Sequence, residues 1–373
     1  MKKTATFLWF LLCCLAFVIG YNLHPKNKSD TPLLNSSTTT FSTQTFQWKM
    51  VTAWPPNFPI FQDGVEQLAK EIELMSGGRL KIQVYAGGEL VPPLQTFDAV
   101  SQGSVEMGHA AAYYWAGKVP AAQFMSSVPF GMTAKGVNAW LYYGGGLELW
   151  REIYKPFNLI PFPAGNSGVQ MGGWFNKKIE SLDDLKGLKM RIPGLGGKVL
   201  AKAGGTPILL AGGEIYTALE RGNIDATEWA GHFHDKRLGL YRAAKYYYYP
   251  GWHEPGSVLE LIINSKAWAQ LPEDLQKIVE VAAQALNQKV YAEFETLNLK
   301  ALQELKEKYH VEVLAFPAEV LKELKRLTVE TLDENAASDA SFKKVYEAYK
   351  KFQADNAAWH SISDDAYSQA LLP

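Results

Sequence analysis

The feature that most constrains the fold is a long segment without glycine or proline in the last third of the chain. It follows Pro272 and runs over residues 273–310 as "EDLQKIVEVAAQALNQKVYAEFETLNLKALQELKEKYH". At a rise of about 1.5 Å per residue, a helix of this length measures about 55 Å, which is longer than one small domain is wide. The segment therefore predicts a helix that runs across two lobes.

Before this helix, the chain alternates between patterns typical of strands and patterns typical of helices. In its first part the expected strands are "FQWKMVTAW" (46–54) and "RLKIQVYAG" (79–87), with an amphipathic helix between them. In its second part they include "LKMRIPG" (188–194) and "NIDATEW" (223–229). Such alternation predicts mainly parallel sheets, and we expect "SVLELIIN" (257–264) to return to the first sheet.

These patterns indicate an α/β protein of two lobes with a ligand cleft between them. The expected first lobe comprises residues 46–165 together with 257–316, which includes part of the spanning helix. The expected second lobe comprises residues 166–256. Residues 317–373 are expected to form C-terminal amphipathic helices.

The N-terminus has the layout of a secretory signal. Two lysines precede an apolar run from Phe7 to Gly20, which at about 14 residues is shorter than the roughly 20 needed to span a bilayer. A cleaved signal and an uncleaved membrane anchor over residues 1–22 both stay open, and the two cysteines of the run leave lipidation as a third alternative. The Ser/Thr-rich stretch 23–45 predicts a flexible linker, so the globular part is expected outside the cytoplasmic membrane.

The composition excludes several classes of protein. A hydrophobic content of 47% and a charged content of 20% are those of a folded globular protein. The formal net charge of −1 argues against nucleic acid or an anionic membrane as the main partner. Both cysteines lie in the leader, so the globular part has no disulfide. The 11 Trp, 18 Tyr and 18 Phe favour a cleft that holds a small polar ligand against ring faces.

Several polar and aromatic residues stand where the expected strands end. In open α/β sheets, ligands bind beyond the carboxyl ends of the strands. Arg191 ends the strand in "LKMRIPG", and its guanidinium group can hold a carboxylate in bidentate fashion, although a salt bridge within one lobe is the alternative. The residues at strand ends are Tyr113, Tyr114, Arg191, Glu228, Trp229 and Glu254.

Glu228 and Glu254 are the hardest of these residues to explain, because a buried carboxylate without a partner is costly. If both line one cleft with Arg191 and an acidic ligand, the net charge is negative and a bound cation would relieve the repulsion. Na⁺ and Ca²⁺ prefer oxygen ligands, which include a backbone carbonyl and an amide oxygen such as that of Gln170. The alternative for Glu254 is a solvated loop position.

Other motifs do not indicate an enzyme. His232 and His234 are two residues apart, and the "HE" of "WHEPG" lacks the second histidine of a zincin helix, so zinc catalysis is not expected. The glycine-rich "PGLGGK" (193–198) matches neither the dinucleotide-binding fingerprint nor a P-loop, although a helix start there would help to hold an anion. No arrangement of Ser, Cys or His indicates a nucleophile.

Three stretches of the chain together resemble the DctP-type solute-binding proteins of TRAP transporters, and above all the branch that binds 2-oxo acids and lactate. They are "GGRLKIQVYAGGELVPPLQTFDAVSQGSVEMGHAAAYYW", "LKGLKMRIPGLGGKVLAKAGGTPILLAGGEIYTALERGNIDATEWAG" and "AKYYYYPGWHEPG". The resemblance extends from about residue 46 to residue 330. It implies a two-lobe periplasmic-binding-protein fold with a long helix that spans both lobes, and delivery of a carboxylate to a membrane permease driven by an ion gradient.

The resemblance also implies roles for individual residues. The implied cation is sodium or calcium, and similar proteins form homodimers through their C-terminal helices. The implied substrate-binding residues are Arg191, Gln170, Tyr113, Tyr114 and Trp229. The implied cation ligands are Gln170, Glu228, Trp229 through its carbonyl group, and Glu254.

We therefore expect a periplasmic, non-enzymatic binder of a small monocarboxylate, such as pyruvate or lactate, with Na⁺ or Ca²⁺ bridging the ligand. A tether to the inner membrane through the N-terminal segment stays open. A dicarboxylate or sugar acid is the alternative ligand and would need a second basic group in the cleft. A metal-dependent lyase or hydrolase would turn the carboxylate over, and a sensory or adhesion module would bind none.

Overall fold

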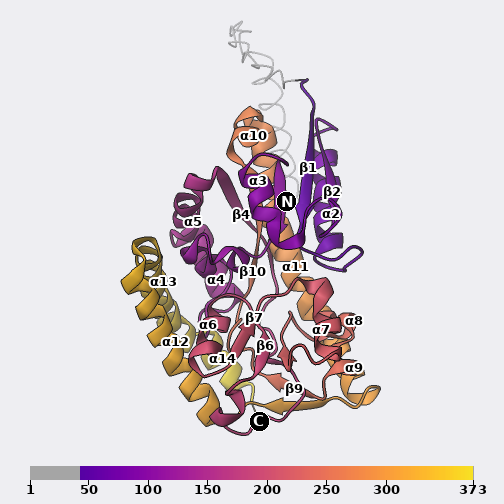
Figure 1. Cartoon of the computed structure of the whole chain (residues 1–373). Helices are drawn as coiled ribbons and strands as arrows, with labels where there is room; N and C mark the ends of the chain where they lie inside the picture. Colours follow the sequence, from indigo (N-terminus) through magenta and orange to yellow (C-terminus); the bar gives the residue numbers. More distant parts are fainter. Residues whose placement is uncertain (1–42, 373) are drawn as a thin grey trace, which may run out of the picture. The chain divides into compact units, whose positions relative to one another are not determined.

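The computed structural model describes residues 43–372, so the expected leader at 1–22 and most of the expected linker at 23–45 lie outside the described residues. Within residues 43–372, no helix is both long enough and apolar enough to cross a membrane. Two sheets organise this part of the chain, one of five strands and one of six (Figure 1). Each sheet has its own helices, and together they form the two expected lobes.

The first sheet has the strand order β2-β1-β3-β10-β4. Its strands are β1 (Phe46–Thr52), β2 (Leu80–Tyr85), β3 (Met107–Ala110), β4 (Leu159–Asn166) and β10 (Val258–Asn264). The longer helices of this lobe are α2 (Gln62–Met75), α3 (Thr96–Ser101), α4 (Ala134–Tyr143), α5 (Gly146–Tyr154) and α10 (Ser265–Gln270). A 3-10 helix, η2 (Ala112–Trp115), follows β3 directly. The expected return of residues 257–264 to the first sheet is confirmed, because β10 lies between β3 and β4.

The second sheet has the strand order β11-β9-β5-β8-β6-β7. Its strands are β5 (Gly173–Phe175), β6 (Lys189–Arg191), β7 (Thr206–Ile208), β8 (Ala226–Thr227), β9 (Tyr246–Tyr249) and β11 (Glu312–Ala315). Its helices are α6 (Gly194–Lys202), α7 (Ile215–Glu220), α8 (His232–Leu238) and α9 (Leu240–Ala243).

Each sheet contains one antiparallel strand, and the other pairings are parallel. The antiparallel strands are β10 in the first sheet and β5 in the second. These are the strands that the chain enters directly from the other sheet, through residues 167–172 before β5 and residues 250–257 before β10. A parallel connection needs a crossover helix, whereas these two links contain none. The expectation of mainly parallel sheets therefore holds apart from these two strands.

One expected lobe boundary differs from the strand pairing. Residues 257–316 were expected to belong to the first lobe, but β11 pairs with β9 of the second sheet, with Glu312 opposite Tyr246. The cause is the long helix α11 (Glu273–Glu307), which starts beside the first sheet and delivers the chain to the second. The last strand of that range is therefore part of the second sheet.

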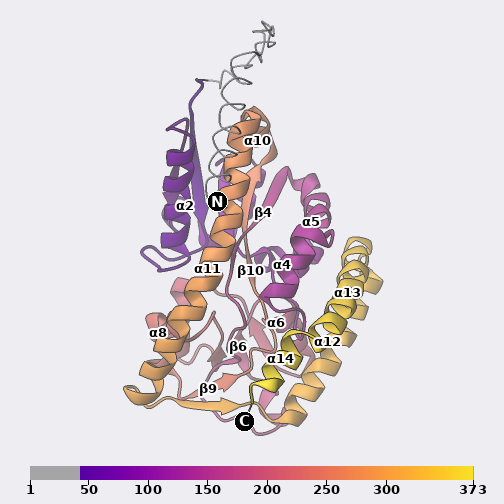
Figure 2. The same cartoon turned by 180° about the vertical axis from the view of Figure 1, so that it is seen from behind.

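Helix α11 confirms the expected helix that spans two lobes. At about 1.5 Å per residue its 35 residues measure about 52 Å. It packs against α2 and β4 of the first lobe and against α8 of the second, a path that can be followed in Figure 2. Its buried residues lie on one stripe and include Val279, Ala283, Val290 and Phe294.

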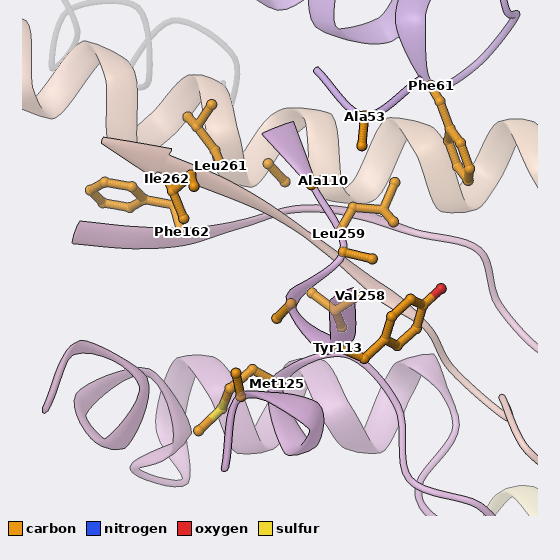
Figure 3. Close-up of a cluster of buried hydrophobic side chains, with 14 of the residues drawn as sticks. Ala53, Phe61, Ala110, Tyr113, Met125, Phe162, Val258, Leu259, Leu261 and Ile262 are labelled. Carbon is orange, nitrogen blue, oxygen red and sulfur yellow. The ribbon is translucent and has the colours of Figure 1, made fainter. Parts of the chain in front are cut away.

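The core of the first lobe is centred on β10, all of whose residues are buried. Figure 3 shows Val258, Leu259, Leu261 and Ile262 of this strand among apolar side chains from neighbouring elements. Three further helices end the chain, namely α12 (Ala318–Ser338), α13 (Ala340–Ser361) and α14 (Asp364–Ala370). Helix α12 packs on α6 of the second lobe, and α13 packs on α4 and α5 of the first.

Candidate functional site

The pairing of β6 with β8 brings Arg191 and Glu228 together. The two strands are parallel, and Arg191 lies opposite Thr227, so Glu228 follows at the carboxyl edge of the sheet. Both side chains are buried, with exposed fractions of 1% and 0%. The Nη1 group of Arg191 donates a hydrogen bond to Oε1 of Glu228. A salt bridge within one lobe was the alternative to carboxylate binding by Arg191. The structure shows such a salt bridge, and the partner of Arg191 in it, Glu228, is itself a candidate site residue.

The remaining contacts of Arg191 involve further candidate residues. Its Nη2 group lies 3.4 Å from the Tyr114 hydroxyl, which is a long hydrogen bond. Its guanidinium carbon lies 5.2 Å from the centre of the Trp229 ring. The Nε group donates to the carbonyl of Leu210 at 3.3 Å. Because these contacts are long, the guanidinium group keeps the capacity to bind an anion.

Glu254 lies in the link that returns the chain to the first sheet, and it is buried, so the alternative of a solvated loop position is wrong. Its Oε2 atom accepts hydrogen bonds from Nε2 of Gln170 at 2.7 Å and from the Ser257 hydroxyl at 2.5 Å. The backbone N–H of Gln170 also donates to the Glu254 carbonyl at 3.1 Å. Burial, and after it the nearby charge of Glu228, raise the pKa of Glu254 well above its usual range.

The carboxylates of Glu228 and Glu254 both lie near a third buried side chain, that of His253. Glu228, His253 and Glu254 each offer a possible ligand atom, and these atoms lie within 4.8 Å of one another. Nε2 of His253 is 3.6 Å from Oε2 of Glu228. In the sequence, His253 of "WHEPG" is only part of an incomplete zinc motif. Its position next to Glu254 was the signal that could have placed it in the site.

The donor set of this cluster fits a bound cation. Among residues 43–372, the buried atoms without a hydrogen-bond partner include Oε1 of Gln170, Oε2 of Glu228 and both ring nitrogens of His253. A buried polar atom without a partner costs about 1–3 kcal/mol. A cation would satisfy the amide and carboxylate oxygens and would offset the charge of the two glutamates.

A small cavity of about 10 Å³ lies beside these groups, so the two lobes are nearly closed over it. The first lobe and η2 contribute aromatic and aliphatic walls, and residues near the two links between the sheets contribute polar groups. The cavity is lined by Trp54, Phe61, Tyr113, Tyr114, Ser167, Gln170, Trp229, Ser257 and Leu259. Of these, Trp54, Phe61, Ser167, Ser257 and Leu259 were not predicted, because only the fold brings them to the cavity.

Tyr113 and Tyr114 both reach the site from η2. Tyr113 is hydrogen-bonded to Glu254, and its Cβ lies close to Gly194 at the start of α6, where an added Cβ would be 2.9 Å away. Burial raises the pKa of Tyr114 to about 12 and that of Tyr113 well above its usual range. Both hydroxyl groups are therefore protonated near neutral pH and can donate hydrogen bonds.

His232 and His234 do not join this cluster. Both begin α8, and Nε2 of His234 is hydrogen-bonded to the carbonyl of Pro59 at 2.8 Å. The His234 ring packs against Phe58, Phe61 and Phe294. These contacts connect α8 to the first lobe and give His234 a structural role between the lobes.

Two lobes joined by crossing segments, with a charged and aromatic site at those segments, define a solute-binding protein of the two-lobe class. Residues 50–339 match the family described as Bacterial extracellular solute-binding protein, family 7 (DctP). The chain belongs to this family. The resemblance found in the sequence is thereby confirmed, and so is the expected two-lobe fold.

Three similar proteins support the same assignment. The chain is 45% identical over 333 residues to a monocarboxylate 2-oxoacid-binding periplasmic protein of Nostoc sp., covering 89% of this chain and 91% of that protein. A TRAP periplasmic solute-binding protein from Colwellia psychrerythraea, with bound calcium and pyruvate, is 43% identical. Another, from Pseudoalteromonas atlantica with bound sodium and pyruvate, is also 43% identical. Each structure matches with a TM-score of 0.86 over 88% of this chain and 100% of the matched chain.

Proposed function

We propose that this protein is the extracytoplasmic solute-binding component of a TRAP transporter and that it binds a small 2-oxo monocarboxylate such as pyruvate, or lactate, together with Na⁺ or Ca²⁺. The observation that carries this proposal is a buried Arg191–Glu228 pair next to a partnerless Gln170 amide oxygen, beside a small aromatic cavity. The pyruvate bound by two related proteins of 43% identity supports it.

Arg191 is the group that would hold the ligand's carboxylate. It is the arginine at the carboxyl end of β6, and its Nη2 group makes only a long contact to Tyr114. A planar guanidinium group binds a carboxylate through two parallel hydrogen bonds. Tyr113 and Tyr114, which line the cavity, would add neutral hydroxyl donors.

Gln170, Glu228, Glu254 and the carbonyl of Trp229 would hold the cation. When bound, Na⁺ or Ca²⁺ would add positive charge beside the two glutamates, of which Glu228 is paired with Arg191 and Glu254 with no cation among the described residues, and would coordinate oxygens of a 2-oxo acid. Gln170 presents its oxygen because its amide nitrogen donates to Glu254 and Ser167. The hydrogen bond from Gln170 to Glu254 thereby fixes which end of the amide is free for coordination.

The cavity walls favour a monocarboxylate over a dicarboxylate or a sugar acid. None of the residues found to line the cavity is Lys or Arg, and four of its walls are apolar side chains, namely Trp54, Phe61, Trp229 and Leu259. A second carboxylate would therefore be buried without a partner, which costs several kcal/mol. A methyl or other small alkyl group would instead pack against the rings.

Ligand binding would close the two lobes about the segments that link them. Gln170 lies in residues 167–172 and Glu254 in residues 250–257, so both links carry candidate ligands. Trp229 of the second lobe packs edge-on against Trp54 and Phe58 of the first. A hinge motion at the links would bring these groups together around the solute and present the closed form to the permease.

The site of action is the periplasm, where the chain would deliver its solute to membrane permease subunits without chemical change. The leader would either be cleaved or tether the protein to the inner membrane. Homodimers would form through the last helices, whose exposed apolar side chains include Trp359, Ile362, Tyr367, Leu371 and Leu372.

A thermal-shift screen of small carboxylates, with and without chelator, tests this function. A ligand at about 100 times its dissociation constant stabilises the folded protein by about 2.7 kcal/mol. We expect pyruvate or lactate to raise the melting temperature in the presence of cation and to lose this effect in Arg191→Lys. The exposed Arg151→Ala is the matched control and should behave as wild type. Stabilisation by dicarboxylates alone would contradict the proposed ligand class.

A further inference from the structure

A third buried glutamate, Glu260, lies in the first lobe, outside the candidate site. Glu260 is on β10 between β3 and β4, opposite Ala110, and its exposed fraction is 0%. Among the described residues it forms no salt bridge. A carboxylate buried without a cation is costly, and a strand that only had to fill a core would carry an apolar side chain at this position.

The Glu260 carboxyl group instead receives two hydrogen bonds from different elements. Nε1 of Trp115 donates to Oε1 at 2.5 Å, and the Tyr154 hydroxyl donates to Oε2 at 2.8 Å. Trp115 is the last residue of η2, whereas Tyr154 is the last residue of α5. Trp115 thus connects Glu260 to η2, which carries candidate site residues. Tyr154 connects Glu260 to α5, which carries none.

The connection through Trp115 leads directly into the site. Trp115 packs edge-on against Tyr114, with ring centres 6.0 Å apart, and Tyr113 precedes both. Tyr114 contacts Arg191, and Tyr113 is hydrogen-bonded to Glu254. Tyr113 also lines the cavity together with Leu259, the residue before Glu260 (Figure 3).

Short helical turns such as η2 have few internal hydrogen bonds and need side-chain contacts to keep one position. In η2 the backbone N–H of Tyr114 donates to Ala111 and that of Ala116 donates to Tyr113. The hydrogen bond from the Trp115 indole to Glu260 fixes the C-terminal end of η2, directly after Tyr113 and Tyr114.

We infer that Glu260 is a positioning residue for the solute site, which through Trp115 holds η2 and so places Tyr113 and Tyr114 against Arg191 and Glu254. The expected effect of Glu260 on ligand affinity rests on the proposed function. Its expected effect on the position of η2 does not depend on that function. A residue of this kind tunes the affinity without touching the solute or the cation.

Three variants test the inference. Glu260→Met removes both acceptors and keeps the length of the side chain. Glu260→Gln keeps the acceptor for Trp115 and can donate to the Tyr154 hydroxyl, so it should rescue. Tyr154→Phe removes the other hydrogen bond to the same carboxyl group but keeps the acceptor for Trp115; because the Tyr154 hydroxyl also lies beside the Trp115 side chain, its effect on η2 should be smaller than that of Glu260→Met rather than absent.

Hydrogen exchange gives a measurement that needs no ligand. In Glu260→Met, the amides of Tyr114 and Ala116 should exchange at least about tenfold faster than in wild type, whereas the β10 amides that report global unfolding should change less. In Glu260→Gln the exchange of η2 should stay near the wild-type rate, and in Tyr154→Phe it should increase clearly less than in Glu260→Met. Unchanged exchange of η2 in Glu260→Met would overturn the inference, whatever the solute is.

Calorimetry with pyruvate and Ca²⁺ then measures the effect on the site. Glu260→Met should weaken binding about tenfold, which corresponds to roughly one hydrogen bond, while Glu260→Gln and Tyr154→Phe stay within about threefold of wild type. Equal losses in Glu260→Met and Tyr154→Phe would show that Glu260 is merely structural. A wild-type protein that binds no 2-oxo acid would contradict the proposed function and leave the exchange result to decide this inference.

Discussion

Replacement of Glu260 by glutamine should change how the stability of the protein depends on pH. Burial raises the pKa of Glu260 to about 7, against a usual value of 4.5, and the hydrogen bonds from Trp115 and Tyr154 only partly oppose this. Because the folded-state pKa lies above the unfolded-state value, the stabilisation by the protonated group is complete below pH 4.5 and is lost as the pH rises through about 7.

The size of the effect follows from the two pKa values. They differ by about 2.5, and one pKa unit corresponds to about 1.4 kcal/mol, so Glu260 lowers the free energy of unfolding by about 3 kcal/mol between pH 4.5 and pH 8. Glutamine does not ionise. The stability of Glu260→Gln relative to wild type should therefore increase by about 3 kcal/mol over the same range.

Urea unfolding at several pH values between 4.5 and 8, followed by tryptophan fluorescence, measures this difference. Asp235, another buried carboxyl group with a pKa raised to about 6 by burial, titrates in both proteins and cancels in the comparison. A difference in stability that stays constant with pH would refute the reasoning, and so would one that decreases as the pH rises.

Four further predictions concern the site and the contact between the lobes. Arg191→Lys should weaken pyruvate binding about 100-fold in calorimetry, because lysine cannot form two parallel hydrogen bonds to a carboxylate. A loss of affinity below about threefold would show that Arg191 does not bind the carboxylate of the ligand. Glu228→Gln should lower the affinity for Ca²⁺ in the presence of pyruvate at least about tenfold, whereas an unchanged Ca²⁺ titration would remove Glu228 from the cation site. His253→Gln should lower the affinity for Ca²⁺ in the same titration about tenfold, because His253 lies 3.6 Å from Glu228 and would help to position its carboxylate. Wild-type affinity for Ca²⁺ in this variant would show that His253 does not contribute to the cation site. His234 is buried with its pKa lowered to about 3, so it should contribute about 2 kcal/mol to the loss of stability on acidification from pH 6.5 to pH 5, because only the unfolded state then takes up its proton. In urea unfolding, His234→Gln, which can still donate to Pro59, should lose about 2 kcal/mol less than wild type over this range, and an equal loss in both proteins would contradict this role.

The parts of the fold that were predictable from the sequence are those whose own residues show a pattern, such as an uninterrupted helical segment or an apolar strand. The helix α11 has no glycine or proline, and the strands expected within 46–54, 79–87, 188–194, 223–229 and 257–264 follow from their apolar patterns. The pairing of β11 with β9 was not predictable in this way, because it depends on where a 35-residue helix ends in space. Strand direction at β5 and β10 likewise depends on the links between the sheets rather than on the strand residues.

The same distinction applies to the candidate site. Arg191 and Glu228 were predictable because each follows an apolar strand, and parallel neighbouring strands bring their carboxyl ends together. The position of His253 next to Glu254 was a local signal for it, whereas Ser257 and Trp54 come from a link and a loop whose course is set by tertiary packing. Glu260 lies in an apolar strand pattern, and only the structure shows that Trp115 and Tyr154 donate hydrogen bonds to it.

The central claim is that a cation and a 2-oxo monocarboxylate bind together at Arg191, Gln170, Glu228 and Glu254. The most direct test is a calorimetric titration of pyruvate into chelator-treated protein, with and without added Ca²⁺ or Na⁺ at matched ionic strength. We expect strong binding with one of these cations and binding at least about 100-fold weaker without it, because Arg191 would then have to offset both Glu228 and the incoming anion. Pyruvate binding of equal strength in the absence of any cation would contradict this account.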